Sequence, residues 1–580
     1  QTIKKKGAIL FKNQNNMKFN DYKYEKINID ETKEKFSNLI KSFSDAENLE
    51  EQTKYMDEII KLRNHIETME TLVSIRHSID TTDEFYNKEN EYVDEISPIL
   101  FGFISEFYKA LVNSKFRADL EKKYGKFLFD LAENTLKTFN EEIIPDLQEE
   151  NRLSSKYSKL IASAKIQFDG EEKNLSEMVP YTQSKDRNVR IEASKKVAHF
   201  FKENKDEFDK IYDGLVKVRT TIAQKLGYKN YVELGYARLS RLEYDSKMVA
   251  SYRKQVLENI VPLHTELRQR QAKRLGLDKL KFYDEPIKFN SGNADPHGDP
   301  EWILNHGKTM YNELSKETAE FFSFMTEKNL LDLLSKKGKM SGGYCTYIPE
   351  YKSPYIFANF NGTSHDVDVL THEAGHAFQV YQSRGYEIPE YLWPTYEACE
   401  IHSMSMEFLT WPWMDLFFEN DAEKYKFIHL SEALLFIPYG VTVDEFQHWV
   451  YENPNATPDD RRAKWLEIEK KYLPTRDYGE VDDLKEGIFW FRQGHIFNSP
   501  FYYIDYTLAQ VCAFQFWIKS QENREKAWDE YLALCKLGGS KPFFELMKAA
   551  NLKNPFDQGT IASVIPKIRE FLESIDDMKL

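Results

Sequence analysis

Two histidines one helical turn apart carry the clearest chemical pattern in the sequence, His372-Glu373-x-x-His376. This spacing places both imidazoles on one helix face, where they can share a metal ion. Zinc held by neutral imidazoles lowers the pKa of its bound water to about 7, and the carboxylate of Glu373 can then take the proton. This chemistry hydrolyses peptide bonds. The motif therefore predicts a catalytic zinc site, which still needs a third ligand.

Candidates for the third ligand lie downstream, in segment 395–411. Glu400 follows the second histidine by 24 residues, which is enough for a helix end, a loop and a returning helix. Glu407 lies two turns further along the same helix face, where a second acid can orient a ligand imidazole. Glu397 and His402 are competing candidates, and spacing alone favours Glu400 only modestly.

Three separated motifs in the same order resemble those of the thimet oligopeptidase/oligoendopeptidase F family of zinc peptidases, peptidase family M3. They are the metal motif, an E-x-x-S pattern that begins at Glu400 and is followed by Glu407, and the segment GHIFNSPFYYIDYTLAQ at 494–510. The stretch NFNGTSHDVDVLTHE at 359–373 is also similar. Within segment 494–510, the residues HIFNSPFYYIDY are more similar to the bacterial oligoendopeptidase F-like branch than to animal thimet oligopeptidase.

The resemblance implies one zinc ion per chain, held by His372, His376 and Glu400. It also implies that Glu373 is the general base, which takes a proton from the metal-bound water and carries it to the leaving amine.

The resemblance further implies that His495, Tyr503 and Tyr506 stabilise the negative charge on the carbonyl oxygen under attack. The gap between the histidine and the first tyrosine is one residue shorter than in the thimet branch. Tyr502 can therefore stand in place of Tyr503, whereas Tyr506 aligns most securely.

Other residues near the metal motif are expected to support its helix. Glycine inside a helix costs about 1 kcal/mol relative to alanine, so Gly375 predicts close packing against another backbone. Asp366 and Asp368 are expected to cap the helix amino terminus, with orientation of a ligand as the alternative. Asp505, which lies between the tyrosines, is expected to be structural.

The composition indicates a globular protein with more than one lobe, because 580 residues exceed what one compact core normally serves. A net charge of −15 argues against nucleic acid as the main partner. Four cysteines without a CxxC pair favour a reducing, cytoplasmic location. No membrane span is expected, and the apolar run within residues 1–16 is too short for a signal peptide. The oligomeric state stays open.

Scarce glycine and apolar residues at three- and four-residue steps predict a mainly α-helical protein. With the resemblance, we expect a two-lobed helical zincin with a deep central channel and a small β-sheet near the metal helix. Segment 342–362 predicts that β structure, either as a hairpin that caps the cleft or as a free edge for an extended peptide. The expected divisions are an amino-terminal helical lobe at 1–185 and a catalytic domain at 186–580, with the metal helix at 367–382, the third-ligand helix at 396–410 and the oxyanion segment at 494–510.

The function implied is that of a cytoplasmic zinc oligoendopeptidase, which hydrolyses internal bonds of short unfolded peptides. A deep channel would admit such peptides and exclude folded proteins. The alternative is a zinc carboxypeptidase or dipeptidyl carboxypeptidase on a related helical fold. A non-catalytic peptide-binding protein is less favoured, because the ligands, the base and the oxyanion donors are all present.

Overall fold

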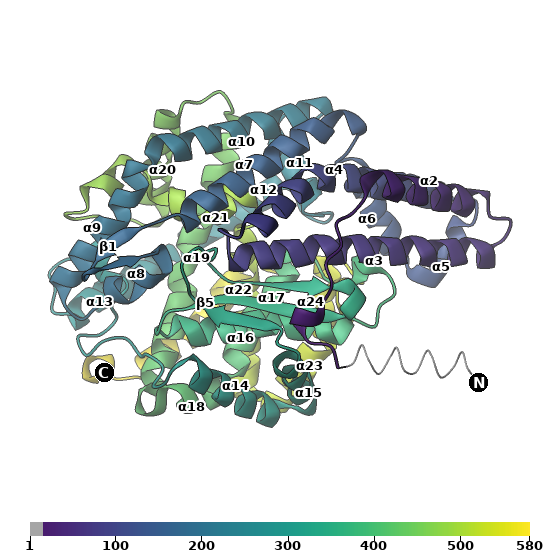
Figure 1. Cartoon of the computed structure of the whole chain (residues 1–580). Helices are drawn as coiled ribbons and strands as arrows, with labels where there is room; N and C mark the ends of the chain where they lie inside the picture. The colour runs from purple at the N-terminus through teal and green to yellow at the C-terminus, as the bar shows by residue number, and fades with distance from the viewer. Residues whose placement is uncertain (1–15) are drawn as a thin grey trace.

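The chain is mainly α-helical with two small sheets, which confirms the predicted fold class (Figure 1). The computed structural model describes residues 16–580, so the expectation about a signal peptide concerns a segment that lies almost wholly outside the described residues. Within that range, no helix has the length and apolar character needed to cross a membrane.

The amino-terminal part of the described chain consists of helices that extend to one side of the molecule (Figure 1). Several begin at side-chain caps such as Asn48 and Asp83, whose oxygens accept a backbone amide of the first turn. The helices are α2 (Ile29–Asp45), α3 (Leu49–Ile79), α4 (Glu84–Val112), α5 (Arg117–Tyr124), α6 (Lys126–Leu136) and α7 (Ile144–Ala162).

A short antiparallel hairpin follows, β1 (Ile166–Phe168) and β2 (Glu171–Lys173). The chain then returns to helix for about 150 residues. These helices are α8 (Leu175–Thr182), α9 (Arg187–Glu203), α10 (Lys205–Lys225), α11 (Tyr231–Arg238), α12 (Ser246–Asn259), α13 (Val261–Arg274), α14 (Pro300–Leu314) and α15 (Lys316–Glu327).

The second sheet has the strand order β3-β5-β4, with β3 parallel and β4 antiparallel to the central strand. Its strands are β3 (Leu331–Leu334), β4 (Tyr344–Ile348) and β5 (Ser353–Phe360). The predicted β structure in 342–362 is therefore confirmed, and β4 lies at a sheet edge. The Tyr344 hydroxyl lies 2.5 Å from the Ser78 hydroxyl, which ties β4 to α3.

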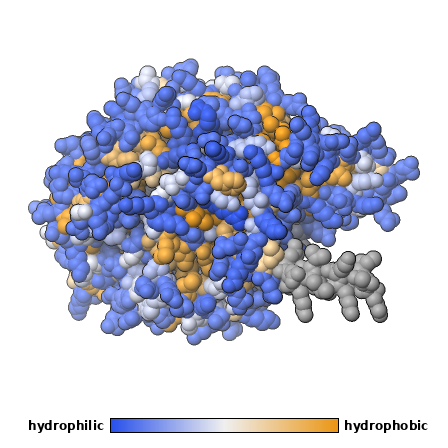
Figure 2. Space-filling model, viewed as in Figure 1, coloured by the Kyte–Doolittle hydropathy of each residue, from blue (hydrophilic) through white to orange (hydrophobic). Residues whose placement is uncertain are grey.

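The carboxyl-terminal part supplies the helices that surround the metal motif. They are α16 (His365–Ser383), α17 (Tyr396–Leu409), α18 (Asp415–Phe418), α19 (Ala422–Glu452), α20 (Pro458–Tyr472), α21 (Gly494–Asn498), α22 (Ile504–Glu522), α23 (Arg524–Leu537), α24 (Phe543–Ala549) and α25 (Thr560–Glu573). One cluster of buried apolar side chains extends from Phe36 in α2 to Ile568 in α25. On the largely hydrophilic face in Figure 2, one gathering of apolar side chains lies over the second sheet and α16.

Two side chains fix where the metal helix begins and how closely it packs. Asp366 accepts the backbone amides of Asn361 and Gly362 at 2.9 and 2.8 Å, so it holds the turn between β5 and α16. A Cβ on Gly375 would lie 2.7 Å from the carbonyl oxygen of His402 and 2.7 Å from Ser403 Cα. The close backbone packing that the glycine predicts is therefore confirmed, and the neighbouring backbone is that of α17.

We expect Gly375→Ala to lower the free energy of unfolding by about 1–3 kcal/mol, because the added methyl group meets backbone that cannot rotate away. This loss should occur although alanine is the better helix former. Gly385→Ala is the matched control, since a Cβ there meets nothing within 4 Å. Urea unfolding measures both, and equal stability of the two variants would contradict this packing.

Candidate metal centre and active site

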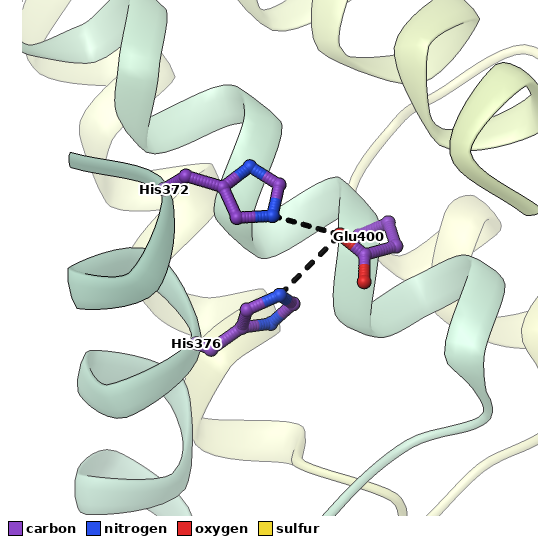
Figure 3. A group of neighbouring side chains, drawn as sticks. All are labelled: His372, His376 and Glu400. Carbon is purple, nitrogen blue, oxygen red and sulfur yellow. Dashed lines mark ion pairs between the residues drawn. The ribbon is translucent and has the colours of Figure 1, made fainter. Parts of the chain in front are cut away.

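Helices α16 and α17 bring the two motif histidines and Glu400 together (Figure 3). The Nε2 atoms of His372 and His376 lie 3.2 and 3.3 Å from Oε2 of Glu400. All three ligand atoms lie within 4.8 Å of one another. Two imidazole nitrogens and one carboxylate oxygen are a donor set that zinc enzymes use, and it leaves one coordination position for water or substrate. The residues present therefore fit a catalytic zinc ion.

Two hydroxyl groups hold the Glu400 carboxylate in place. Tyr502 donates a hydrogen bond to Oε1 at 2.6 Å, and Ser403 donates to Oε2 at 2.8 Å. Burial by itself raises the pKa of Glu400, but the two neighbouring imidazoles outweigh it and hold that pKa well below its ordinary value. The carboxylate thus stays ionised, as a metal ligand must.

Glu407 orients one of the imidazoles. Its Oε2 lies 3.0 Å from Nδ1 of His372, which favours a proton on Nδ1 and would leave Nε2 to bind a metal ion held between the imidazoles and Glu400. The expectation that the second acid on α17 contacts a ligand imidazole is met. Glu407 Oε1 in turn lies 3.2 Å from Nε2 of His429 on α19.

The competing candidates on α17 face other parts of the molecule. Nδ1 of His402 lies 3.4 Å from the Cys535 sulfur, and Glu397 accepts a hydrogen bond from Thr395 at 2.7 Å. Of these three candidates on α17, only Glu400 joins the two motif histidines.

Glu373 is buried beside the metal ligands with one oxygen unpaired. Its Oε2 has no hydrogen-bond partner within residues 16–580. Burial raises the pKa of this carboxyl, while the charges of His372 and His376 act in the opposite direction. A buried carboxyl of raised pKa beside metal-type ligands is a candidate general base.

His495 and Tyr506 form a second polar group. Nε2 of His495 lies 2.9 Å from the Tyr506 hydroxyl, and the Gln493 amide nitrogen lies 3.0 Å from Nδ1. Burial lowers the pKa of His495 to about 4, so the ring is neutral at neutral pH. With Nδ1 accepting from Gln493, the ring proton lies on Nε2, where it is directed at the Tyr506 hydroxyl.

A strained residue, Phe501, directly precedes the two adjacent tyrosines. Phe501 has φ of +68°, and its backbone is held by Gln447 at 3.0 Å and by Arg241 at 2.6 Å. Arg241 also pairs with Asp505 at 2.8 Å, and both side chains are fully buried, in line with the structural role expected for that aspartate.

After this turn the two tyrosines have different neighbours. Tyr502 donates to Glu400, whereas Tyr503 packs edge-on against Tyr439 with ring centroids 5.7 Å apart. The sequence left open which tyrosine is nearer the metal ligands. The structure places the Tyr502 hydroxyl against a ligand and Tyr503 in the cavity wall.

A cavity of about 670 Å³ lies over these residues. Its wall contains one of the motif histidines, the adjacent glutamate and the three expected oxyanion residues, namely His372, Glu373, His495, Tyr503 and Tyr506. Sequence reasoning missed His429, Gln493 and Arg241. His429 and Arg241 lie far along the chain from Glu407 and Asp505, which they contact, so no local spacing links them. Gln493 lies two residues before His495, and its position next to that histidine was the available signal.

Comparisons with known proteins identify the family of this chain. Residues 180–564 match the sequence profile of "Peptidase family M3", and residues 19–139 match that of the "Peptidase M3 N-terminal domain". The chain is 59% identical to the solved structure of PZ peptidase A with an inhibitor, covering 97% of this chain and 100% of that one, with a TM-score of 0.96.

Two further similarities are more distant. An oligoendopeptidase F homolog of Borreliella burgdorferi is 24% identical over 513 residues, which is 83% of this chain and 84% of that protein. The structure of oligoendopeptidase F from Enterococcus faecium is 15% identical and covers 95% of this chain and 99% of that one, with a TM-score of 0.62. At that identity the likeness shows the fold.

We expect Tyr502→Phe to weaken zinc binding about 10- to 100-fold, because it removes the hydroxyl that holds Glu400. Tyr503→Phe is the matched control and should bind zinc as the wild type does. Competition with a chromophoric chelator measures both dissociation constants. Weaker binding by the Tyr503 variant alone would reverse the assignment of the two hydroxyls.

Proposed function

Because this chain belongs to peptidase family M3 as an oligoendopeptidase F-like peptidase, we propose that it is a zinc-dependent enzyme that hydrolyses internal bonds of short unfolded peptides. The observation that supports this most is the convergence of the two motif imidazoles on Glu400, beside the unpaired carboxylate oxygen of Glu373.

In the proposed mechanism, His372, His376 and Glu400 hold one zinc ion per chain. When bound, zinc supplies a Lewis acid that lowers the pKa of a coordinated water to about 7 and polarises the peptide carbonyl. Glu407 keeps the proton of His372 on Nδ1, and Tyr502 and Ser403 keep the Glu400 carboxylate turned toward the imidazoles.

Glu373 serves as the general base. Its carboxylate accepts a proton from the attacking water and then delivers that proton to the nitrogen of the leaving amine. Burial raises the pKa of this carboxyl, which makes it a better base than an exposed glutamate.

Hydrogen-bond donors in the cavity wall stabilise the carbonyl oxygen as it gains negative charge. His495 holds its proton on Nε2, toward the Tyr506 hydroxyl, so the tyrosine proton is free to be donated to substrate. Tyr503 lines the same cavity, and its hydroxyl is proposed as a second donor to substrate, with His495 acting through Tyr506. Removal of one such donor typically lowers the rate about 10²- to 10³-fold.

A strand edge beside the cavity supports the proposal that the substrates are peptides. Extended peptide can pair its backbone with a free strand edge, and β4 is the edge strand that precedes the metal helix. The start of β4 is close to the base, since a Cβ on Gly343 would lie 3.5 Å from Oε1 of Glu373. An extended substrate on this edge would pass the base and the metal ligands.

We propose that the chain divides as the sequence predicts, into an amino-terminal lobe at 1–185 and a catalytic domain at 186–580. The separate family matches at 19–139 and 180–564 support them. A cytoplasmic setting is also proposed, and the four free cysteines support a reducing compartment.

Internally quenched peptides with both ends blocked test the endopeptidase proposal. We expect cleavage at an internal bond whether or not the carboxyl terminus is amidated, and loss of cleavage after zinc is removed by a chelator. Restored cleavage on adding zinc is the control. If amidation of the carboxyl terminus abolishes cleavage, the carboxypeptidase alternative replaces this proposal.

Glu373→Gln tests the proposed base. The amide cannot accept the proton of the water, so kcat should fall by several orders of magnitude, while zinc content and peptide affinity stay near those of the wild type. Single-turnover kinetics and zinc analysis on the same preparation measure both. Equal kcat values would refute the role of Glu373.

A further inference from the structure

A second group of metal-type ligands lies directly behind the first. Asp368, Glu407 and His429 bring their ligand atoms within 4.8 Å of one another. The group is mostly buried and shares Glu407 with the metal centre, because that carboxylate also contacts His372. By residue type alone it could hold a second cation next to the proposed zinc ion.

The indole of Trp411 decides against that reading. Its Nε1 donates a hydrogen bond to Nδ1 of His429 at 2.8 Å. An indole N–H can only donate, so Nδ1 must present its lone pair and the proton of the neutral ring must lie on Nε2. Nε2 lies 3.2 Å from Glu407 and is therefore a donor to that carboxylate. A metal ion would need the lone pair that this nitrogen does not have.

Packing keeps both rings in this arrangement. The Trp411 ring lies against Phe571 and Trp517, with centroids 5.4 and 6.0 Å apart. The His429 ring lies between Tyr425, which stacks on it at 5.4 Å and 13°, and Phe408 at 4.7 Å. Neither ring can turn over without displacing these neighbours.

The same hydrogen bonds continue to the proposed zinc ligand. Glu407 accepts from His429 through Oε1 and from His372 through Oε2, at 3.2 and 3.0 Å. We propose that Trp411, His429 and Glu407 are positioning residues that fix the tautomer and orientation of His372, and that the Trp411 indole keeps the second group closed to metal ions. The inference rests on the zinc site of the proposed function.

A pair of substitutions of similar size separates this role from simple packing. In His429→Gln, the side-chain amide can donate to Glu407 from the position of the histidine Nε2. In His429→Leu, the side chain fills the space but has no donor. We expect the Gln variant to bind zinc within about threefold of the wild type. The Leu variant should bind it about 10- to 100-fold more weakly, as is typical when a partner of a ligand imidazole is lost.

Chelator competition measures the three dissociation constants, and urea unfolding identifies any variant that fails to fold. Equal affinity of the Gln and Leu variants would overturn the positioning role. Failure of the wild type itself to bind zinc would instead count against the proposed function, so the two failures are distinguishable.

Trp411→Phe tests whether the Trp411 indole keeps the second group closed to metal ions. This test is independent of whether the His429→Leu variant folds. Without the indole donor, the proton of His429 can move to Nδ1, and the Nε2 lone pair then faces Asp368 and Glu407. We expect this variant to bind two zinc ions per chain in a titration followed by elemental analysis, where the wild type binds one.

Trp413→Phe is the matched control, because Trp413 lies in the same turn but donates to Glu313 at 2.7 Å, away from the cluster. It should bind one zinc ion. One ion per chain in the folded Trp411 variant, or two in the wild type, would overturn the inference.

Discussion

The backbones of α16 and α17 touch at Gly375, and every distance in the metal centre depends on this contact. A side chain there would meet the carbonyl of His402 and the Cα of Ser403 at 2.7 Å, so only glycine lets the helices approach so closely. This approach puts two imidazoles from one helix against a carboxylate from the other. Ser403, part of the contact, also donates to Glu400, so packing and ligand orientation share the same residue.

Close packing buries many ionisable groups, and the centre is stable only if nearly every one has a partner. Glu400 has Tyr502 and Ser403, Glu407 has two imidazoles, and Asp505 has Arg241. Glu373 is buried among these groups, where the proposed mechanism requires a base.

Local spacing was enough to predict part of this centre, and contacts between distant elements account for the rest. The i,i+4 repeat of His372 and His376 dictates a shared helix face, and the aromatic and β-branched residues of 342–362 dictate strands. Spacing could not show whether Glu400 or Glu397 faces the motif histidines, because that depends on how α17 is rotated against α16. The family resemblance was needed to choose Glu400. Spacing could not say which of the neighbouring tyrosines contacts Glu400, because the turn before them depends on Phe501, which has positive φ and is held by Gln447 and Arg241 from distant parts of the chain.

The central claim is that two imidazoles and one carboxylate hold a single zinc ion. X-ray absorption at the zinc edge, on protein loaded with one equivalent, tests it most directly because nitrogen and oxygen ligands scatter differently from sulfur. The account predicts two imidazole ligands with the remaining ligands oxygen. Cys399 adjoins Glu400 in sequence, but its sulfur donates to the Pro394 carbonyl at 3.3 Å, so no sulfur ligand is expected. A spectrum with sulfur in the zinc coordination sphere, or with only one imidazole, would contradict the account.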